Sequence, residues 1–320
     1  MGTSSPLALP LLLLFAVATG VAGCAARTST RVEDPSVVAQ ETAAAQAGVQ
    51  WREFKLALRP DSVGDVGSAA KKFWAIASPL AEKHGARVRP PRKPFKQSKQ
   101  EVALLDTEDS RLKSQGLILR KRGRDDAPGG SPACEYTLKR RSADVRVAFA
   151  STASLQPADG KPAAVKLKDE VVVDPARAGA ARNVYAAEST VRTTLRSRKV
   201  TVGDVIAVFP GIASSAGSPE AALVPVNGVR IEQVQVDLGE VVFTGGSSVK
   251  PMIIVWRERG GGNVVAAEFT FGEKLVDGQS PTPADDKAMH DYFAALQGAA
   301  RDWVATPTQT ASIYSDGIGS

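Results

Sequence analysis

The chain has 320 residues, a net charge of +6 and only two cysteines and two histidines. Because the chain has so few cysteines and histidines, a disulfide framework, a zinc centre and a histidine-based catalytic triad are not expected. Aromatic residues make up 6% of the sequence and are not interleaved with the basic residues, so no nucleic-acid partner is expected.

Residues 1–24 have the features of an export signal. Leu7 to Val17 form an apolar run, which is shorter than the ~20 apolar residues that a membrane-spanning helix needs. No Lys or Arg precedes this run, which departs from the usual signal. The sequence Val-Ala-Gly-Cys at 21–24 resembles the lipobox of bacterial lipoproteins, which implies that Cys24 becomes the lipidated first residue. The alternative is a cleavable signal without lipidation.

Lipidation at Cys24 would hold the exported protein on a membrane of the bacterial cell envelope. In a Gram-negative cell that membrane is expected to be the outer one, because Ala25 replaces the aspartate of a retention signal. Residues 25–48 are rich in Ala, Thr and Gln and predict a flexible tether. Residues 49–304 are predicted to fold into one domain, and residues 305–320 to form a disordered tail.

The folded part is predicted to begin with a strand over 51–59 and a helix over 66–83. In the strand, Glu53 and Lys55 lie on one face and Phe54 and Leu56 on the other. The helix has apolar residues at the spacing of one face. The basic segment 87–99 contains three prolines, so we expect an extended, solvated connector facing water or anionic lipid headgroups.

Two basic pairs follow on neighbouring strands. The strand at 101–105 leads through a polar turn to a strand at 117–122, where Arg120 and Arg122 lie on the same face. Paired guanidinium groups suit a phosphate chain, because each can donate two hydrogen bonds to anionic oxygens. The next strand, 135–141, carries Lys139 and Arg141 on a shared face.

The rest of the chain is predicted to alternate strands and helices. Strands are expected at 145–149, 163–173, 230–243, 250–259 and 263–271, and helices around 183–195, 201–209 and 284–304. In the strand at 163–173, Lys166, Lys168 and Glu170 alternate with apolar residues. Strands joined by hairpins, with a helix near each end, predict an α+β fold built on an antiparallel β-barrel.

The ordered motifs resemble the CYTH group of triphosphate tunnel metalloenzymes, which includes class IV adenylyl cyclases and thiamine triphosphatases. The resemblance extends over roughly a third of the chain and is carried by Glu53 and Lys55, Asp106-Thr107, Leu112, Leu119 to Arg122, and Thr137 to Lys139. It implies a barrel of eight antiparallel strands, open as a tunnel, whose charged residues face a wet lumen.

The resemblance also implies a binding site for a triphosphate, a polyphosphate or another phosphorylated molecule. Its phosphate-binding positions correspond to Lys55, Arg120, Arg122 and Lys139, with Arg141 as an addition on the same face. Its ligands for Mg²⁺ or Mn²⁺ correspond to Glu53, Glu170, Asp237 and Glu268. No single catalytic residue is assigned.

Two departures from the family pattern weaken the expected metal site. Trp51 stands where the opening motif has a glutamate, and Ala266 stands where Glu268 would have an acidic partner. Because Mg²⁺ affinity depends on ligand charge and geometry, phosphate binding is better supported than catalysis. Two readings stay open: a lipid-anchored, metal-dependent triphosphatase, and a non-catalytic structural or ligand-binding envelope lipoprotein with a degenerate site.

Overall fold

The computed structural model describes residues 46, 48–93, 95–123, 134–158, 165–177, 179–193, 199–275 and 281–306. The expectations for the signal segment, for Cys24, for most of the tether and for the tail beyond residue 306 lie outside these residues. None of the described helices is long and apolar enough to span a membrane.

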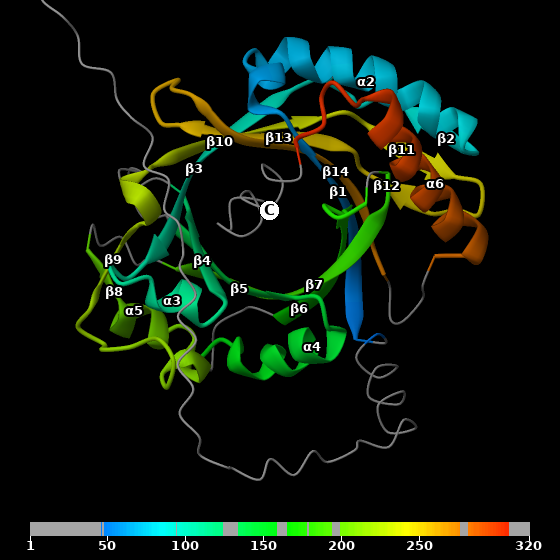
Figure 1. Cartoon of the computed structure of the whole chain (residues 1–320). Helices are drawn as coiled ribbons and strands as arrows, with labels where there is room; N and C mark the ends of the chain where they lie inside the picture. Colours follow the sequence, from blue (N-terminus) through cyan, green and yellow to red (C-terminus); the bar gives the residue numbers. More distant parts are fainter. Residues whose placement is uncertain are drawn as a thin grey trace, which may run out of the picture.

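Nine strands form a closed barrel, seen along its axis in Figure 1. They follow the order β10-β13-β14-β1-β6-β7-β5-β4-β3, and the pairing of β3 with β10 closes the ring. The strands are β1 (Val49–Leu58), β3 (Gln97–Asp106), β4 (Leu117–Arg122), β5 (Cys134–Ser142), β6 (Val165–Val173), β7 (Ala181–Thr193), β10 (Ile231–Asp237), β13 (Met252–Glu258) and β14 (Val264–Lys274).

The barrel corrects two details of the expected architecture. It has nine strands instead of eight, and β1 and β6 are parallel while the other neighbouring barrel strands are antiparallel. The short strands β8 (Val200–Thr201) and β9 (Ala222–Pro225) extend the sheet beside β3. A separate small sheet contains β2 (Ala86–Arg89), β11 (Glu240–Phe243) and β12 (Ser248–Val249).

Helices cover the outside of the barrel on two sides (Figure 1). The helices α2 (Val66–Lys83) and α6 (Pro283–Ala299) pack over the strands from β10 to β1. The helix α4 (Val145–Ser154) lies against β5, β6 and β7. Two short helices, α3 (Arg111–Ser114) and α5 (Val202–Ile206), lie near β4 and β8.

The largest apolar core lies between the outer face of the barrel and α2 and α6. Phe54 of β1 stacks on Phe271 of β14 at a centroid distance of 4.7 Å, and Phe293 of α6 lies 5.5 Å from Phe54. Phe73 of α2 contacts Phe269 at 4.9 Å. Because side chains alternate along a strand, this outward apolar face directs the intervening polar residues into the barrel.

Two elements differ in type from the prediction. Residues 145–149, expected as a strand, begin α4, where the side chain of Asp144 accepts a hydrogen bond from the Arg146 N–H at 2.8 Å. A helix was expected around residues 183–195, but these residues belong largely to β7, which pairs with β5 and β6. The Ala- and Arg-rich composition of residues 175–200 favours a helix, but the long-range pairing of β7 with two neighbours outweighs this weak preference.

Replacing Phe54 with alanine should destabilise the protein by about 3–5 kcal/mol, because this ring is fully buried between the barrel and α6. Chemical denaturation of the two proteins measures the difference. Phe149→Ala is the matched control, since the Phe149 side chain on α4 is 45% exposed. Similar losses in both variants would contradict the assigned core.

Candidate functional site

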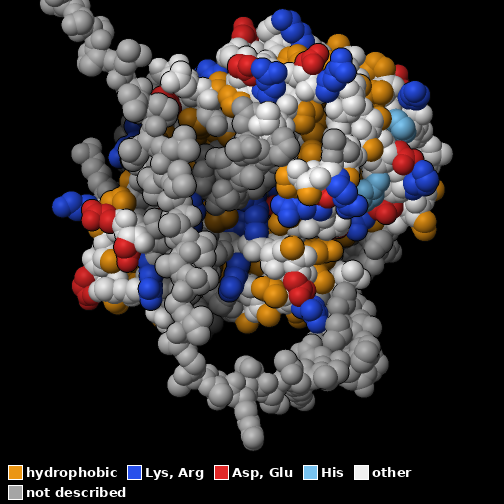
Figure 2. Space-filling view, in the orientation of Figure 1, with side chains coloured by type: hydrophobic (Ala, Val, Ile, Leu, Met, Phe, Trp, Pro, Cys, Tyr) orange, Lys and Arg blue, Asp and Glu red, His pale blue; other side chains and the backbone are white. Residues whose placement is uncertain are grey.

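The inner face of the barrel carries a cluster of charged side chains, which surround a cavity of about 550 Å³ that we call the lumen cavity. Figure 2 shows Lys and Arg side chains in the hollow at the centre of the view. The residues that line the cavity include Trp51, Glu53, Arg120, Arg122, Glu135, Lys166, Lys168, Glu188, Thr190, Gln235, Lys250, Met252 and Thr270. Most of them lie on barrel strands.

Glu170 is the centre of the buried ionic network beside this cavity. Its Oε1 accepts hydrogen bonds from Lys55 Nζ at 2.8 Å and from Lys139 Nζ at 2.5 Å, and its Oε2 accepts one from Arg141 Nε at 2.9 Å. Lys55 and Glu170 are both fully buried. One carboxylate on β6 therefore holds three basic side chains from β1 and β5.

Two further glutamates extend the network towards the cavity. Glu53 lies 3.2 Å from Lys55 Nζ and 3.5 Å from Lys168 Nζ. Glu188 on β7 pairs with Lys168 at 2.8 Å and lies 3.9 Å from Lys139. The acids and amines of β1, β5, β6 and β7 thus alternate through the interior as one connected set.

The network shifts the pKa values of its members in opposite directions. Burial by itself would lower the pKa of Lys55, but the carboxylates of Glu170 and Glu53 outweigh it and raise that pKa. Burial would raise the pKa of Glu170, yet the charges on Arg141, Lys139 and Lys55 hold it well below its usual value. For Glu188, burial is likewise outweighed, here mainly by Lys168, and the pKa falls to about 2.

Lys139 is the member of the network that titrates near neutral pH. Burial and then the charge on Arg141 lower its pKa to about 7, although Glu170 and Glu188 act in the opposite direction. Lys55 and Arg141 already supply two positive charges to Glu170. A proton on Lys139 is therefore held weakly, and the network gains a positive charge when the pH falls below about 7.

Arg120 differs from Lys55, Lys139 and Arg141, because it has no hydrogen-bond or ion-pair partner among the described residues. Its Nε is buried and unpartnered, as is the Nε of Arg122. Burial and the nearby charge on Arg122 lower the pKa of Arg120 to about 10. Arg122 has one carboxylate nearby, Glu135, at 3.5 Å. The two guanidinium groups on β4 therefore face the lumen cavity with donor capacity left over.

The structure places the sequence-predicted phosphate-binding residues together inside the barrel. Lys55, Lys139 and Arg141 surround Glu170, while Arg120 and Arg122 line the adjacent cavity. The Asp106-Thr107 turn has a local structural role instead. Asp106 accepts hydrogen bonds from the N–H groups of Leu112 at 2.8 Å and Lys113 at 2.9 Å, which caps α3.

The four acids proposed as metal ligands do not form one site. Glu53 and Glu170 are paired with buried cations, and fully buried Glu268 also acts on Lys55, whose pKa it raises. Asp237 does not lie with the other three, which corrects the expectation for this residue. It is exposed at the end of β10, outside the lumen cavity, and accepts a hydrogen bond from the Gly239 N–H at 2.9 Å.

The donor set therefore does not fit a resident divalent metal. Mg²⁺ and Mn²⁺ need several carboxylate or carbonyl oxygens directed at one point. Across the described residues, no group of three or more His, Cys, Asp or Glu side chains is placed to hold a metal ion. Both oxygens of Glu170 already accept hydrogen bonds from basic side chains.

Sequence reasoning missed two lumen acids, Glu188 and Glu135, and gave no site role to Lys166 or Lys168. Glu188 was missed because β7 was predicted to be helical. Lys168 was recognisable, since it alternates with Glu170 on the face of a predicted strand. Glu135 shares the inner face of β5 with Thr137 and Lys139, so the same alternation could have found it.

The interior also has an apolar side. Ala57, Val102, Ile231, Ile254, Trp256 and Ala266 are buried there and pack with Ala305. These residues come from β1, β3, β10, β13 and β14, whereas most of the charged residues come from β4, β5, β6 and β7. The lumen cavity lies between the two groups, so a ligand there would meet the cations on one side of the barrel.

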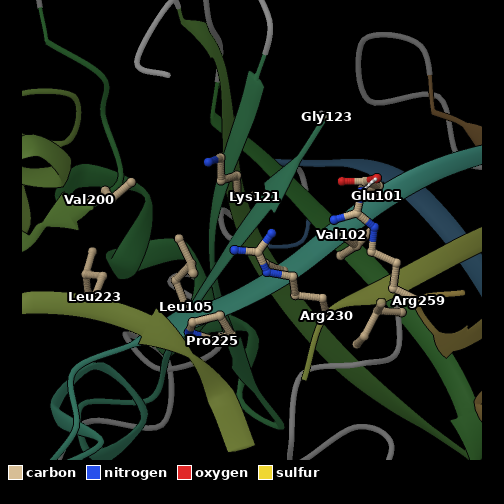
Figure 3. A pocket seen from close by; sticks show the side chains of 12 residues that line it. Glu101, Val102, Leu105, Lys121, Gly123, Val200, Leu223, Pro225, Arg230 and Arg259 are labelled. Carbon is tan, nitrogen blue, oxygen red and sulfur yellow. Dashed lines mark ion pairs between the residues drawn. The ribbon is translucent and has the colours of Figure 1, made fainter. Parts of the chain in front are cut away.

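Another cavity, of about 70 Å³, lies between β3 and the β8–β9 extension. Figure 3 shows its lining residues, with Glu101 and Arg259 paired at 3.0 Å. Apolar side chains including Val200 and Leu223 form part of its wall. This cavity is much smaller than the lumen cavity and is not connected to the Glu170 network by any of its lining residues.

No protein-family model matches the sequence, and no curated protein matches it either. Similar solved structures include a proposed adenylyl cyclase from Hippeastrum that is reported to have a dominant triphosphatase activity. It is 12% identical, with 84% of this chain and 96% of that chain covered and a TM-score of 0.40.

Two further solved structures are proposed adenylate cyclases. One, from Bacillus halodurans, is 13% identical, with 81% of this chain and 93% of that chain covered and a TM-score of 0.33. The other, from Vibrio parahaemolyticus, is 10% identical, with 81% and 94% covered and a TM-score of 0.31.

Replacing Glu170 with glutamine should destabilise the protein by about 3–5 kcal/mol at neutral pH, because it leaves buried cations without their shared carboxylate. The folded-state pKa of Glu170 is lowered, so its contribution is present at neutral pH and is lost as the pH falls through that pKa. The gap between wild type and variant should therefore narrow in acid.

Urea denaturation at several pH values measures this gap. Glu135→Gln is the matched control, since Glu135 is only partly buried and its contact with Arg122 is longer, at 3.5 Å. Equal stability of wild type and Glu170→Gln at neutral pH would contradict the central place given to this carboxylate.

Proposed function

We propose that the barrel interior binds the phosphate chain of a triphosphate, a polyphosphate or another phosphorylated anion. The observation that carries this proposal is Arg120, whose buried Nε lacks a hydrogen-bond partner among the described residues and which lines the lumen cavity beside Arg122. A buried N–H donor without an acceptor is unfavourable, and a bound anion would supply the missing acceptor.

The surrounding residues suit a linear chain of phosphates better than a single anion. Arg120 and Arg122 are two residues apart on one strand face, so each guanidinium would meet a different phosphoryl group. Across the cavity, Lys166 and Lys168 line the wall on β6. A chain with several negative charges would bridge these two strands, whereas a monovalent anion would contact only one.

Binding without turnover is the activity that the donor set supports best. The Mg²⁺ or Mn²⁺ expected from the resemblance enters this proposal only as a companion of the ligand, bound by the ligand's own phosphate oxygens. The carboxylates of Glu53 and Glu170 would keep their lysine partners, so their role would be to hold the basic residues in position. Hydrolysis of the ligand, the alternative, would appear as phosphate release in the test below.

We also propose a place for the protein in the bacterial cell envelope. The apolar run at 7–17 and the sequence Val-Ala-Gly-Cys support a lipoprotein signal at 1–24 and lipidation of Cys24. Residues 25–48 would then act as a tether to the barrel domain at 49–304, and 305–320 as a tail. A membrane position would present the lumen to phosphorylated molecules outside the cytoplasm.

Tripolyphosphate should bind to the purified protein, and Arg120→Gln should weaken that binding by about 10–100-fold, because a charge-assisted hydrogen-bonding group is lost from the site. Isothermal titration calorimetry measures the affinity. Arg177→Gln is the control, since this arginine lies in an exposed turn and pairs only with Asp174 among the described residues.

The same titration is repeated with EDTA, and phosphate release is followed with Mg²⁺ or Mn²⁺ present. The proposal expects tight binding in EDTA and no phosphate release. Absence of binding by the wild-type protein, or equal binding by Arg120→Gln, would contradict it. Release of phosphate that depends on the metal and on Glu268 would instead establish the triphosphatase alternative.

The affinity for tripolyphosphate should also depend on pH through Lys139. Because its pKa is about 7, Lys139 is charged below that value and neutral above it, so its contribution to anion binding is lost as the pH rises. The ligand changes its own charge over the same range. Lys139→Met, titrated beside the wild type, separates the two effects.

The ratio of wild-type to Lys139→Met affinity should reach about tenfold near pH 6 and approach one near pH 8.5. Thermal unfolding of both proteins at each pH confirms that the variant stays folded. A ratio that is constant over this range would contradict the assignment of a near-neutral pKa to Lys139.

A further inference from the structure

A basic groove lies at the mouth of the barrel where β10 and β13 meet the small sheet. It is lined by residues 89–93, 96 and 98, by the turn between β10 and β11, and by Lys250 and Met252, and its volume is about 850 Å³. The segment 87–99 was expected to be a solvated connector. In the structure, residues 89–93, 96 and 98 of this segment form one wall of the groove.

The groove has an excess of positive charge that is not neutralised within the described part of the chain. Its two acids are already engaged: Asp237 accepts a hydrogen bond from Gly239, and Glu240 pairs with Arg89 at 3.1 Å. Four exposed basic residues of the lining have no ion-pair partner among the described residues: Arg92, Lys93, Lys96 and Lys250.

The wall that carries three of these residues is held in place by the fold. Gly239 has a φ of +118°, and a Cβ added to it would lie 2.3 Å from the Arg89 carbonyl oxygen and 3.1 Å from Pro91 Cδ. This close approach fixes the start of the wall against the β10–β11 turn. Phe95 holds the part of the wall near Lys96, because its ring packs against the large apolar core and lies 5.9 Å from the Lys71 ammonium.

The groove adjoins the lumen cavity at the barrel rim. Three residues, Gln235, Lys250 and Met252, line both spaces. Gln235 lies on the inner face of β10, and Met252 begins β13, so the shared wall is part of the barrel rim. A ligand that emerges from the lumen at this rim would enter the groove and meet its four unpaired cations.

We propose that the basic groove binds the continuation of a linear inorganic polyphosphate chain whose one end occupies the lumen cavity. This inference rests on the proposed function and narrows its ligand to chains longer than triphosphate. The lumen would take the first phosphates through Arg120 and Arg122, and the groove would take later ones. Two linked sites on one chain raise its affinity without any new contact in the lumen.

The groove fits this ligand better than two other polyanions. A single-stranded nucleic acid would need aromatic side chains for base stacking, and none stands among the described lining residues. An anionic lipid surface would meet the exposed cations, but it would not reach the basic residues of the adjacent lumen cavity. A flexible chain of phosphates would contact the cations of both spaces across the rim that they share.

The experiment compares tripolyphosphate with a long-chain polyphosphate on the full-length protein. The groove variant combines Arg92→Gln, Lys93→Gln and Lys96→Gln, all at exposed positions. A control variant removes the same number of charges elsewhere, with Lys72→Gln, Arg177→Gln and Arg301→Gln, also at exposed positions. Affinities are measured by calorimetry over a series of salt concentrations.

We expect the wild-type protein to bind the long chain at least about tenfold more tightly than tripolyphosphate, and with a steeper salt dependence. The groove variant should lose this preference and keep its affinity for tripolyphosphate, while the control variant behaves like the wild type. Arg120→Gln should weaken binding of both ligands.

Four results would overturn the inference. The groove site would be contradicted by an equal affinity of the wild-type protein for both ligands, or by a groove variant that keeps the preference for the long chain. Neither result would contradict the proposed lumen site. Absence of tripolyphosphate binding by the wild-type protein would contradict the proposed lumen site, and the groove inference, which rests on it, would fail as well. In a Cys24→Ser background, which removes the proposed lipid anchor, loss of flotation with phosphatidylglycerol vesicles, but not of polyphosphate binding, in the groove variant would identify the groove as a lipid-facing surface.

Discussion

The interaction on which the barrel interior depends is the contact of the Glu170 carboxylate with three basic side chains. Lys55, Lys139 and Arg141 bring positive charge into a space that water hardly reaches, and an isolated buried charge is strongly unfavourable. By accepting from all three, Glu170 allows β1, β5 and β6 to direct these residues inward. The same carboxylate is thereby occupied, which explains why the interior is organised around cations and not around a divalent metal.

The outside of the barrel provides the stability that this charged interior needs. Aromatic residues on the outer faces of β1 and β14 pack against α2 and α6, so the strands are held by apolar contacts on that side. The alternation of side chains then makes an apolar exterior and a polar interior two consequences of one pattern. Arg120 differs from Lys55, Lys139 and Arg141, because its buried Nε has no hydrogen-bond partner among the described residues.

Local alternation made much of this predictable from the sequence. The inward placement of Lys55, Arg120 and Lys139 follows from the period of two in strands with one clearly apolar face. Features set by distant contacts were not predictable in the same way. A helix was predicted in place of β7 because residues 175–200 are rich in Ala and Arg, and the inward position of Glu188 was therefore missed. The parallel pairing of β1 with β6 and the closure of β3 on β10 depend on residues far apart in the chain, and no local pattern specifies them. Asp237 was misplaced because the length of its strand could not be known.

A crystal structure of the protein grown with tripolyphosphate would show whether the barrel interior holds a phosphate chain. We expect a bound phosphate chain in the lumen cavity, with the guanidinium groups of Arg120 and Arg122 donating to its oxygens and with Glu170 still in contact with Lys55. An empty lumen at saturating ligand, or a chain bound only on the outer surface, would contradict the claim that these inward-facing cations form a phosphate-binding site.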